Sequence, residues 1–161
     1  MNPFMRIALA EALGGMHTNE GGPFGAVIVQ KTASPGAGPR LVARAHNRVI
    51  ATKDPTAHAE IEAIREASHA LGRFDLSDCE IYATCEPCPM CLAAIHWARI
   101  PMVYYGCGRV EAASAGFADE HISDVMRGVS SGSPVSSVQV DARECGEAFR
   151  EWEQKPDKVR Y

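Results

Sequence analysis

Hydrophobic side chains recur at helical spacing in the first segment of the chain and at strand spacing in the next two. Residues 4–13 carry apolar side chains at helical spacing, and the glycine pair at 14–15 predicts the end of that helix. Apolar and β-branched residues at 24–29 and 41–45 predict two strands. The Gly- and Pro-rich residues 31–39 between them predict a hairpin-type loop.

The middle of the chain alternates between helix and strand patterns. Ile61, Ile64, Ala67 and Leu71 share one helical face, and Gly72 predicts the end of that helix, so that His58 and Glu60 fall in its first turn. We expect a strand at 80–84, a helix from about Pro87 to Arg99, and a strand at 102–105. Strands alternating with helices indicate parallel strands with right-handed crossovers, which place both helix starts at the carboxyl edge of the sheet.

The last part of the chain is less regular. A short helix is expected at 119–128, and the Ser-, Gly- and Pro-rich residues 130–136 indicate a loop. Alternating polar and apolar residues predict a strand at 137–142, and residues 144–152 have a helical pattern. A short polar tail follows Pro156.

Composition fits one globular domain over residues 1–161, with 46% hydrophobic and 22% charged residues. The sequence has no apolar run long enough for a membrane span and no secretion signal at its start, so we expect a cytoplasmic protein. Without such a signal, the six cysteines indicate free thiols or metal ligands. The net charge of −4 weighs against a nucleic-acid substrate.

Two short motifs carry the candidate chemistry. The first is His58-Ala59-Glu60, and the second is Pro87-Cys88-Pro89-Met90-Cys91. One imidazole and two thiolates form the nitrogen and sulfur ligand set that Zn²⁺ prefers, and three protein ligands leave a fourth position for water. Zinc lowers the pKa of such a water to about 7. Glu60, two residues after the ligand histidine, is placed to move protons.

The cysteines allow other interpretations. Cys85, Cys88 and Cys91 are spaced as in part of an iron–sulfur motif, but no fourth cysteine follows within 92–100. A redox-active Cys-x-x-Cys pair would leave the His-x-Glu motif without a role. A structural zinc site, closed by Cys85 or Cys79 as a fourth ligand, stays open at this point.

The two motifs form the signature of the zinc-dependent base deaminases. Three longer stretches, together with Ala115-Gly116-Phe117 and the terminal Tyr161, resemble the bacterial guanine deaminases of the cytidine deaminase superfamily. These stretches are Gly22-Pro23-Phe24-Gly25-Ala26-Val27, Pro55-Thr56-Ala57-His58-Ala59-Glu60 and Cys85-Glu86-Pro87-Cys88-Pro89-Met90-Cys91-Leu92. Plant guanosine deaminases are similar over the same stretches.

The resemblance implies a three-layer αβα fold with a central five-stranded mixed sheet. It also implies a homodimer in which the C-terminal tail, residues 154–161, crosses to close an active site. One zinc ion per subunit would be bound by His58, Cys88 and Cys91, with Glu60 as the proton shuttle. The substrate, a small purine, would be contacted by Phe24, Asn47, Ala59, Asp119 and Tyr161. Ala118 departs from the family, which usually has an acidic residue at this position.

The expected reaction is therefore hydrolytic deamination of guanine to xanthine and ammonia. Glu60 would take a proton from the zinc-bound water, pass it to a ring nitrogen, and then assist the departure of ammonia. The alternatives are deamination of guanosine, cytosine or a tRNA adenosine. A zinc-stabilised binding module without turnover is the alternative from a different functional class.

Overall fold

The computed structural model describes the chain except for residues 32–37, 130–131, 133–134 and 161. In chain order its elements are α1 (Pro3–His17), β1 (Gly25–Gln30), β2 (Arg40–His46), α2 (Val49–Thr52), α3 (Ala59–Leu71), β3 (Cys79–Cys85), α4 (Pro89–Trp97), β4 (Val103–Cys107), α5 (Arg109–Ser114), α6 (Glu120–Met126) and α7 (Ala142–Gln154). Most of the predicted hairpin loop lies outside the described residues.

The described residues form one four-stranded mixed sheet in the order β2-β1-β3-β4. Strand β1 is antiparallel to both β2 and β3, and β3 is parallel to β4. Therefore β2, β3 and β4 run in the same direction, as the alternation of strands and helices predicts, and their carboxyl ends lie at one edge of the sheet. The amino end of β1 lies at this same edge.

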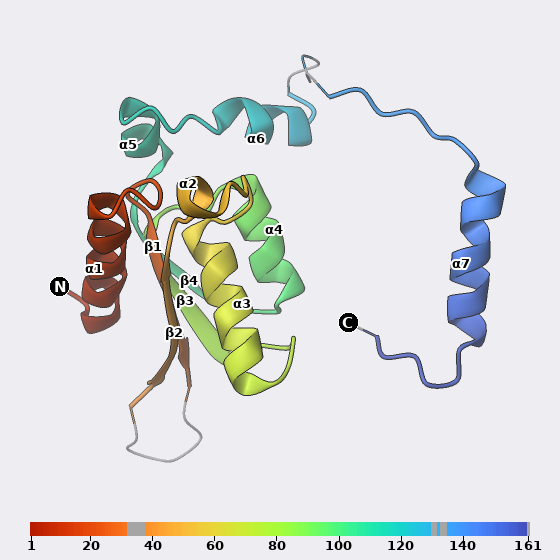
Figure 1. Ribbon diagram of the computed structural model, residues 1–161, viewed down its shortest axis with the longest axis horizontal. Helices are drawn as coiled ribbons and strands as arrows, with labels where there is room; N and C mark the ends of the chain where they lie inside the picture. The colour runs from red at the N-terminus through yellow and green to blue at the C-terminus, as the bar shows by residue number, and fades with distance from the viewer. Residues whose placement is uncertain (32–37, 130–131, 133–134, 161) are drawn as a thin grey trace.

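Helices cover both faces of the sheet, so the predicted three-layer architecture is confirmed (Figure 1). On one face, Val27, Val29 and Tyr82 pack with Ala8 of α1. On the other face, side chains such as Ile28 and Ile81 pack against α3 and α4. Strand β1 has buried residues on both faces, which explains its continuous apolar run and its central position.

The predicted end of the first helix at Gly14-Gly15 is wrong, because α1 continues through both glycines to His17. A Cβ atom on Gly15 would lie 2.2 Å from Cδ2 of the His46 ring. The glycine is therefore required for close packing of α1 against the end of β2. Helix α3 begins at Ala59, so that Glu60 lies in its first turn as predicted, whereas His58 occupies the N-cap position.

The predicted strand at 137–142 is also wrong, and with it the fifth strand of the sheet. Residues 135–141 have no regular structure, and Val138 and Val140 are 83% and 69% exposed. The alternating pattern suits a strand, but a strand needs a neighbour to accept its backbone hydrogen bonds. None of the described strands pairs with this segment. Helices α2 and α5, which the sequence pattern did not predict, are short connections near the edge that carries the functional residues.

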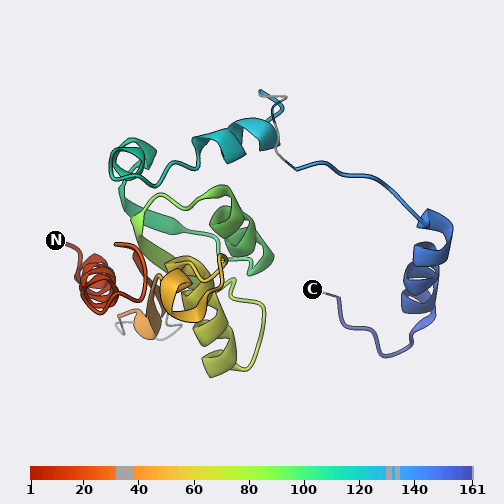
Figure 2. The same cartoon turned by 45° about the horizontal axis from the view of Figure 1, so that its top comes forward.

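Residues 135–141 extend away from the layered body, and α7 stands apart from the sheet in both views (Figures 1 and 2). No residue of α7 is buried, and Phe149 on this helix is 73% exposed. In the described part of the chain, no helix is both long enough and apolar enough to cross a membrane.

Candidate active site

The candidate site lies at the edge of the sheet where β2, β3 and β4 end and β1 begins. Asn47 follows β2, Cys88 follows β3, and Arg109 follows β4. Phe24 immediately precedes β1, and because β1 is antiparallel to its neighbours, this residue lies at the same edge. Loops at the carboxyl ends of parallel strands form the sites of open α/β sheets, and this topology brings distant parts of the sequence together.

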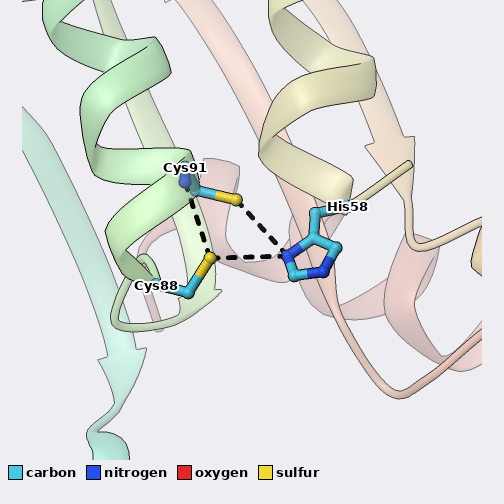
Figure 3. Close-up of side chains that lie close together, drawn as sticks. All are labelled: His58, Cys88 and Cys91. Atoms are coloured by element: carbon cyan, nitrogen blue, oxygen red, sulfur yellow. Dashed lines mark hydrogen bonds between the residues drawn. The ribbon is translucent and has the colours of Figure 1, made fainter. Parts of the chain in front are cut away.

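His58, Cys88 and Cys91 point toward one another at the starts of α3 and α4 (Figure 3). Nδ1 of His58 lies 3.6 Å from Sγ of Cys88 and 3.4 Å from Sγ of Cys91. A tetrahedral zinc ion with ordinary bond lengths separates its nitrogen and sulfur ligands by about 3.5 Å. The donor types and their spacing therefore fit a zinc ion.

The helix start at Cys88 favours the thiolate form that a metal ligand needs. The Cys88 sulfur accepts hydrogen bonds from the thiol and backbone N–H of Cys91 and contacts His58, and these interactions lower the pKa of Cys88 to about 4. The N-terminal end of α4 adds a favourable dipole. The contact with Cys88 also raises the pKa of His58, and it raises the pKa of Cys91. A zinc ion bound by these three residues would displace the protons that they hold.

The predicted proton shuttle lies beside the metal ligands. Glu60 is only 7% exposed, and its Oε2 lies 3.5 Å from Sγ of Cys91. Burial raises the pKa of Glu60, because a carboxylate loses hydration inside the protein. A carboxyl group with a raised pKa can both hold and release a proton near neutral pH.

A closed structural site with a fourth cysteine is not supported by the geometry of the described residues. Their metal-competent cluster of His, Cys, Asp and Glu side chains consists of His58, Cys88 and Cys91 alone. Cys79 is fully buried and donates to Asp78, and Cys85 is directed at the carbonyl of Gly108. Three ligands with an acid beside them are typical of a catalytic metal centre.

A cavity of about 660 Å³ opens onto this cluster, within the range of roughly 300–1,000 Å³ that is typical of ligand sites. Its lining brings Phe24, Asn47 and Asp119 together with His58 and Glu60. Cys91 and Ala59 are fully buried and are not among the residues that line the cavity. Tyr161 lies outside the described residues, so its predicted contact stays a prediction.

Asn47 is buried and held in one orientation. Its side-chain oxygen accepts hydrogen bonds from the backbone N–H groups of Gly22 and Val49, at 3.2 and 3.3 Å. Its own backbone N–H donates to the carbonyl of Phe24. With the oxygen occupied in this way, the side-chain NH₂ group has no partner among the described residues and is available to donate to a ligand.

Aromatic side chains form one wall of the cavity. The rings of Phe24 and Phe117 meet edge to face, with centroids 4.9 Å apart. Phe117, Ala118 and Asp119 come from the connection between α5 and α6 and line the cavity together. The departure at Ala118 therefore leaves Asp119 at the cavity, where its negative charge contributes to the raised pKa of His58.

Sequence reasoning missed the polar contacts between the cavity wall and α6. Nη2 of Arg109 lies 3.1 Å from Glu86 Oε1, and Nη1 donates to the buried hydroxyl of Ser123 at 3.1 Å. The Nε atom of Arg109 is buried with no hydrogen-bond partner among the described residues. Glu86 and Arg109 follow β3 and β4, so the strand-end rule that pointed to Cys88 could also have identified them.

Comparison with known proteins supports the assignment of this cluster as a zinc site. Residues 1–107 match the family described as the cytidine and deoxycytidylate deaminase zinc-binding region. The chain is 40% identical to a guanine deaminase of Bacillus subtilis over 158 residues, 98% of this chain and 97% of the relative. An X-ray structure of guanine deaminase from Bacillus subtilis superposes with a TM-score of 0.85 at 40% identity, covering 100% of this chain and 99% of that structure.

A second group of relatives matches a shorter part of the chain. A tRNA-specific adenosine deaminase of Agrobacterium fabrum is 41% identical over 134 residues, which cover 78% of this chain and 83% of the relative. The matches to the guanine deaminase and to the tRNA-specific adenosine deaminase both include the zinc-binding region. His58, Cys88 and Cys91 are the residues in this region that can hold the ion. The chain therefore belongs to the cytidine and deoxycytidylate deaminase family of zinc-binding proteins.

Proposed function

We propose that this protein is a zinc-dependent enzyme that hydrolyses guanine to xanthine and ammonia. The observation that carries this proposal is the similarity to guanine deaminase over nearly the whole chain, including the part beyond residue 107 that the family match does not reach. That part supplies Arg109, Phe117 and Asp119 to the cavity wall. Similarity there bears on substrate choice rather than on zinc binding alone.

The protein groups have separate roles in the proposed reaction. Zinc, when bound, supplies Lewis acidity that makes hydroxide available near neutral pH. Glu60 takes a proton from the attacking water and delivers it to the ring nitrogen beside C2 of guanine. It then assists the departure of the exocyclic amine as ammonia. Because Glu60 regains its starting protonation state in each cycle, one buried carboxyl group can protonate both the ring nitrogen and the leaving amine.

The cavity wall is suited to a flat purine with donors and acceptors on its edge. Phe24 offers an aromatic ring for stacking and meets the ring of Phe117 edge to face. The NH₂ group of Asn47 can donate to a purine carbonyl, and the carboxylate of Asp119 can accept from purine N–H groups. Ala59, which lies between His58 and Glu60 in the sequence, is fully buried.

We further propose a homodimer in which the C-terminal segment of each subunit closes the other subunit's site. Helix α7 leaves Phe149 largely exposed, and Trp97 at the end of α4 is 69% exposed. Contact between subunits would bury such exposed aromatic side chains. Light scattering should give about twice the chain mass of 17.3 kDa, and a monomer of full activity would contradict this arrangement.

We propose the cytoplasm as the location, since the six cysteines are free.

The decisive experiment measures ammonia release from a panel of substrates by the zinc-loaded protein. We expect turnover of guanine, with slower or no turnover of guanosine, adenine, cytosine and a tRNA anticodon stem-loop. Preference for the stem-loop would instead assign the chain to the tRNA adenosine deaminases. If no substrate releases ammonia and zinc removal unfolds the protein, the alternative of a structural zinc module would replace the proposal.

A further inference from the structure

His46, the last residue of β2, contacts a carboxylate with each of its two ring nitrogens. Nδ1 lies 3.4 Å from Oε2 of Glu11 on α1, and Nε2 lies 3.3 Å from Oε2 of Glu20 in the loop before β1. An ionised carboxylate can only accept hydrogen bonds, and a neutral imidazole has only one N–H. Both contacts are therefore hydrogen bonds at the same time only when the ring carries two protons.

The position of the imidazole is restricted by the backbone of α1. A Cβ atom on Gly15 would overlap the ring, so the glycine provides the space in which the ring lies. The ring is half-buried, and Arg44 and Arg48 contact the same carboxylates, Arg44 with Glu11 and Arg48 with Glu20, each at 3.3 Å. His46, its two carboxylate partners and the two arginines line a surface cleft. The other charged side chains in this cleft come from α3 and are Glu62, Arg65 and Glu66.

Glu20 connects this cluster to the substrate cavity. Its backbone carbonyl accepts hydrogen bonds from the N–H groups of Ile50 and Ala51, at 3.1 and 3.0 Å, and so holds α2. The next residues, 21–24, line the cavity, and α2 contributes Ile50 to the same wall. The hydrogen bond from His46 is the largest of the causes that lower the pKa of Glu20, so this carboxylate is charged at neutral pH.

We propose that doubly protonated His46 is a positioning residue for the substrate cavity. Through Glu20 it holds residues 21–24 and α2 against Asn47, which is the next residue after His46. Loss of its proton removes one of the two hydrogen bonds and loosens this wall, so affinity for the base falls as the pH rises. This inference rests on the proposed guanine deaminase function only for the choice of substrate in its test.

The test compares wild type with His46→Gln, whose side chain is of similar size but cannot carry the charge. At pH 6 we expect KM for guanine to rise about fivefold in the variant while kcat changes less than twofold, as loss of one partly exposed charge-assisted hydrogen bond implies. Because loss of a ring proton removes one of the two hydrogen bonds, KM in wild type should rise from pH 6 to pH 8.5, and in the variant it should be flat. Glu20→Gln should likewise make KM independent of pH. Agreement between the two variants would show that a folding defect of one of them is not the cause.

The matched control is His69→Gln, since His69 is exposed in the last turn of α3, away from the cavity. This variant should keep the wild-type pH profile of KM. A His46→Gln profile identical to wild type, or an equal loss of kcat and kcat/KM, would overturn the positioning role.

A second measurement separates this inference from the proposed function. The backbone amide NMR signals of Gly21 and Gly22 should move with pH in wild type over the same range and stay fixed in His46→Gln. If the wild-type protein releases no ammonia from guanine, the proposed function fails while these signals still decide the role of His46. Signals that respond equally in both proteins would exclude it.

Discussion

At the scale of single residues, two glutamates in the first turn of α3 have opposite surroundings. Glu60 is buried beside the metal ligands, and burial raises its pKa. Glu62 reaches outward and pairs with Arg65 at 2.6 Å. Both lie near the positive end of the helix, so the helix dipole does not distinguish them. Burial and the metal cluster make Glu60 the candidate for proton transfer.

Replacement of Glu60 by glutamine should abolish proton transfer while leaving the metal ligands intact. We expect kcat for guanine to fall roughly 10²–10⁴-fold, the usual contribution of a general acid–base group. Zinc content, measured by atomic emission on the purified variant, should remain one ion per chain. Glu62→Gln serves as the matched control and should retain nearly wild-type turnover. Wild-type kcat in Glu60→Gln would remove this residue from the mechanism.

At the scale of elements, α1 contains adjacent glycines with different environments. Gly14 is exposed, and a Cβ atom there would meet nothing within 4 Å. Gly15 is buried against the ring of His46. A glycine pair usually suggests a helix end, but here one glycine is required by packing against β2 and the other only weakens the helix.

This difference predicts stability changes of opposite sign for two neighbouring substitutions. Gly14→Ala should stabilise the protein by about 0.5–1 kcal/mol, because alanine loses less backbone entropy in a helix. Gly15→Ala should destabilise it by about 1–3 kcal/mol, because the new methyl group displaces the imidazole. Urea denaturation of both variants measures the two changes. Changes of the same sign would show that α1 does not pack on His46 as described.

At the scale of the whole molecule, carboxylates connect the loops at the edge opposite to the metal site. Asp75, in the loop after α3, accepts a hydrogen bond from the backbone of Ser77 and pairs with Arg99 at 2.6 Å. Asp78 in the same loop binds Gln30 and Arg73. These contacts, with Ser77 the largest for Asp75 and Gln30 the largest for Asp78, lower the pKa of both aspartates.

Lowered carboxyl pKa values predict a loss of stability in acid. A group whose pKa is lower in the folded state contributes its stability above the unfolded pKa, about 3.9 for aspartate, and loses it as the pH falls further. We therefore expect Asp75→Asn to lower Tm at pH 7, and the difference from wild type to shrink as the pH falls toward 2. Thermal denaturation from pH 7 to 2 tests this, with the exposed Glu66→Gln as control. A Tm difference that is independent of pH would mean that charge at Asp75 is irrelevant.

The sequence by itself determined the metal centre, because its geometry depends on short-range spacing. Cys88 and Cys91 are one helical turn apart, and His58 and Glu60 flank the start of α3, so a few residues of local structure place each pair. The positions of four strands also followed from local periodicity. The motif alone carried the family assignment that the comparisons confirm.

Tertiary structure decided the features that depend on contacts between distant segments. The contacts of Arg109 with Glu86 and Ser123 and of Phe24 with Phe117 arise only when strand ends meet at one edge of the sheet. A glycine is required at position 15 of α1 because the imidazole of His46, 31 positions further along the sequence, packs against it. The alternation at 137–142 satisfies the local pattern of a strand, but no described strand lies beside it to complete its hydrogen bonds. Periodicity reports the local environment of a residue, whereas pairing and packing depend on which distant neighbour the fold supplies.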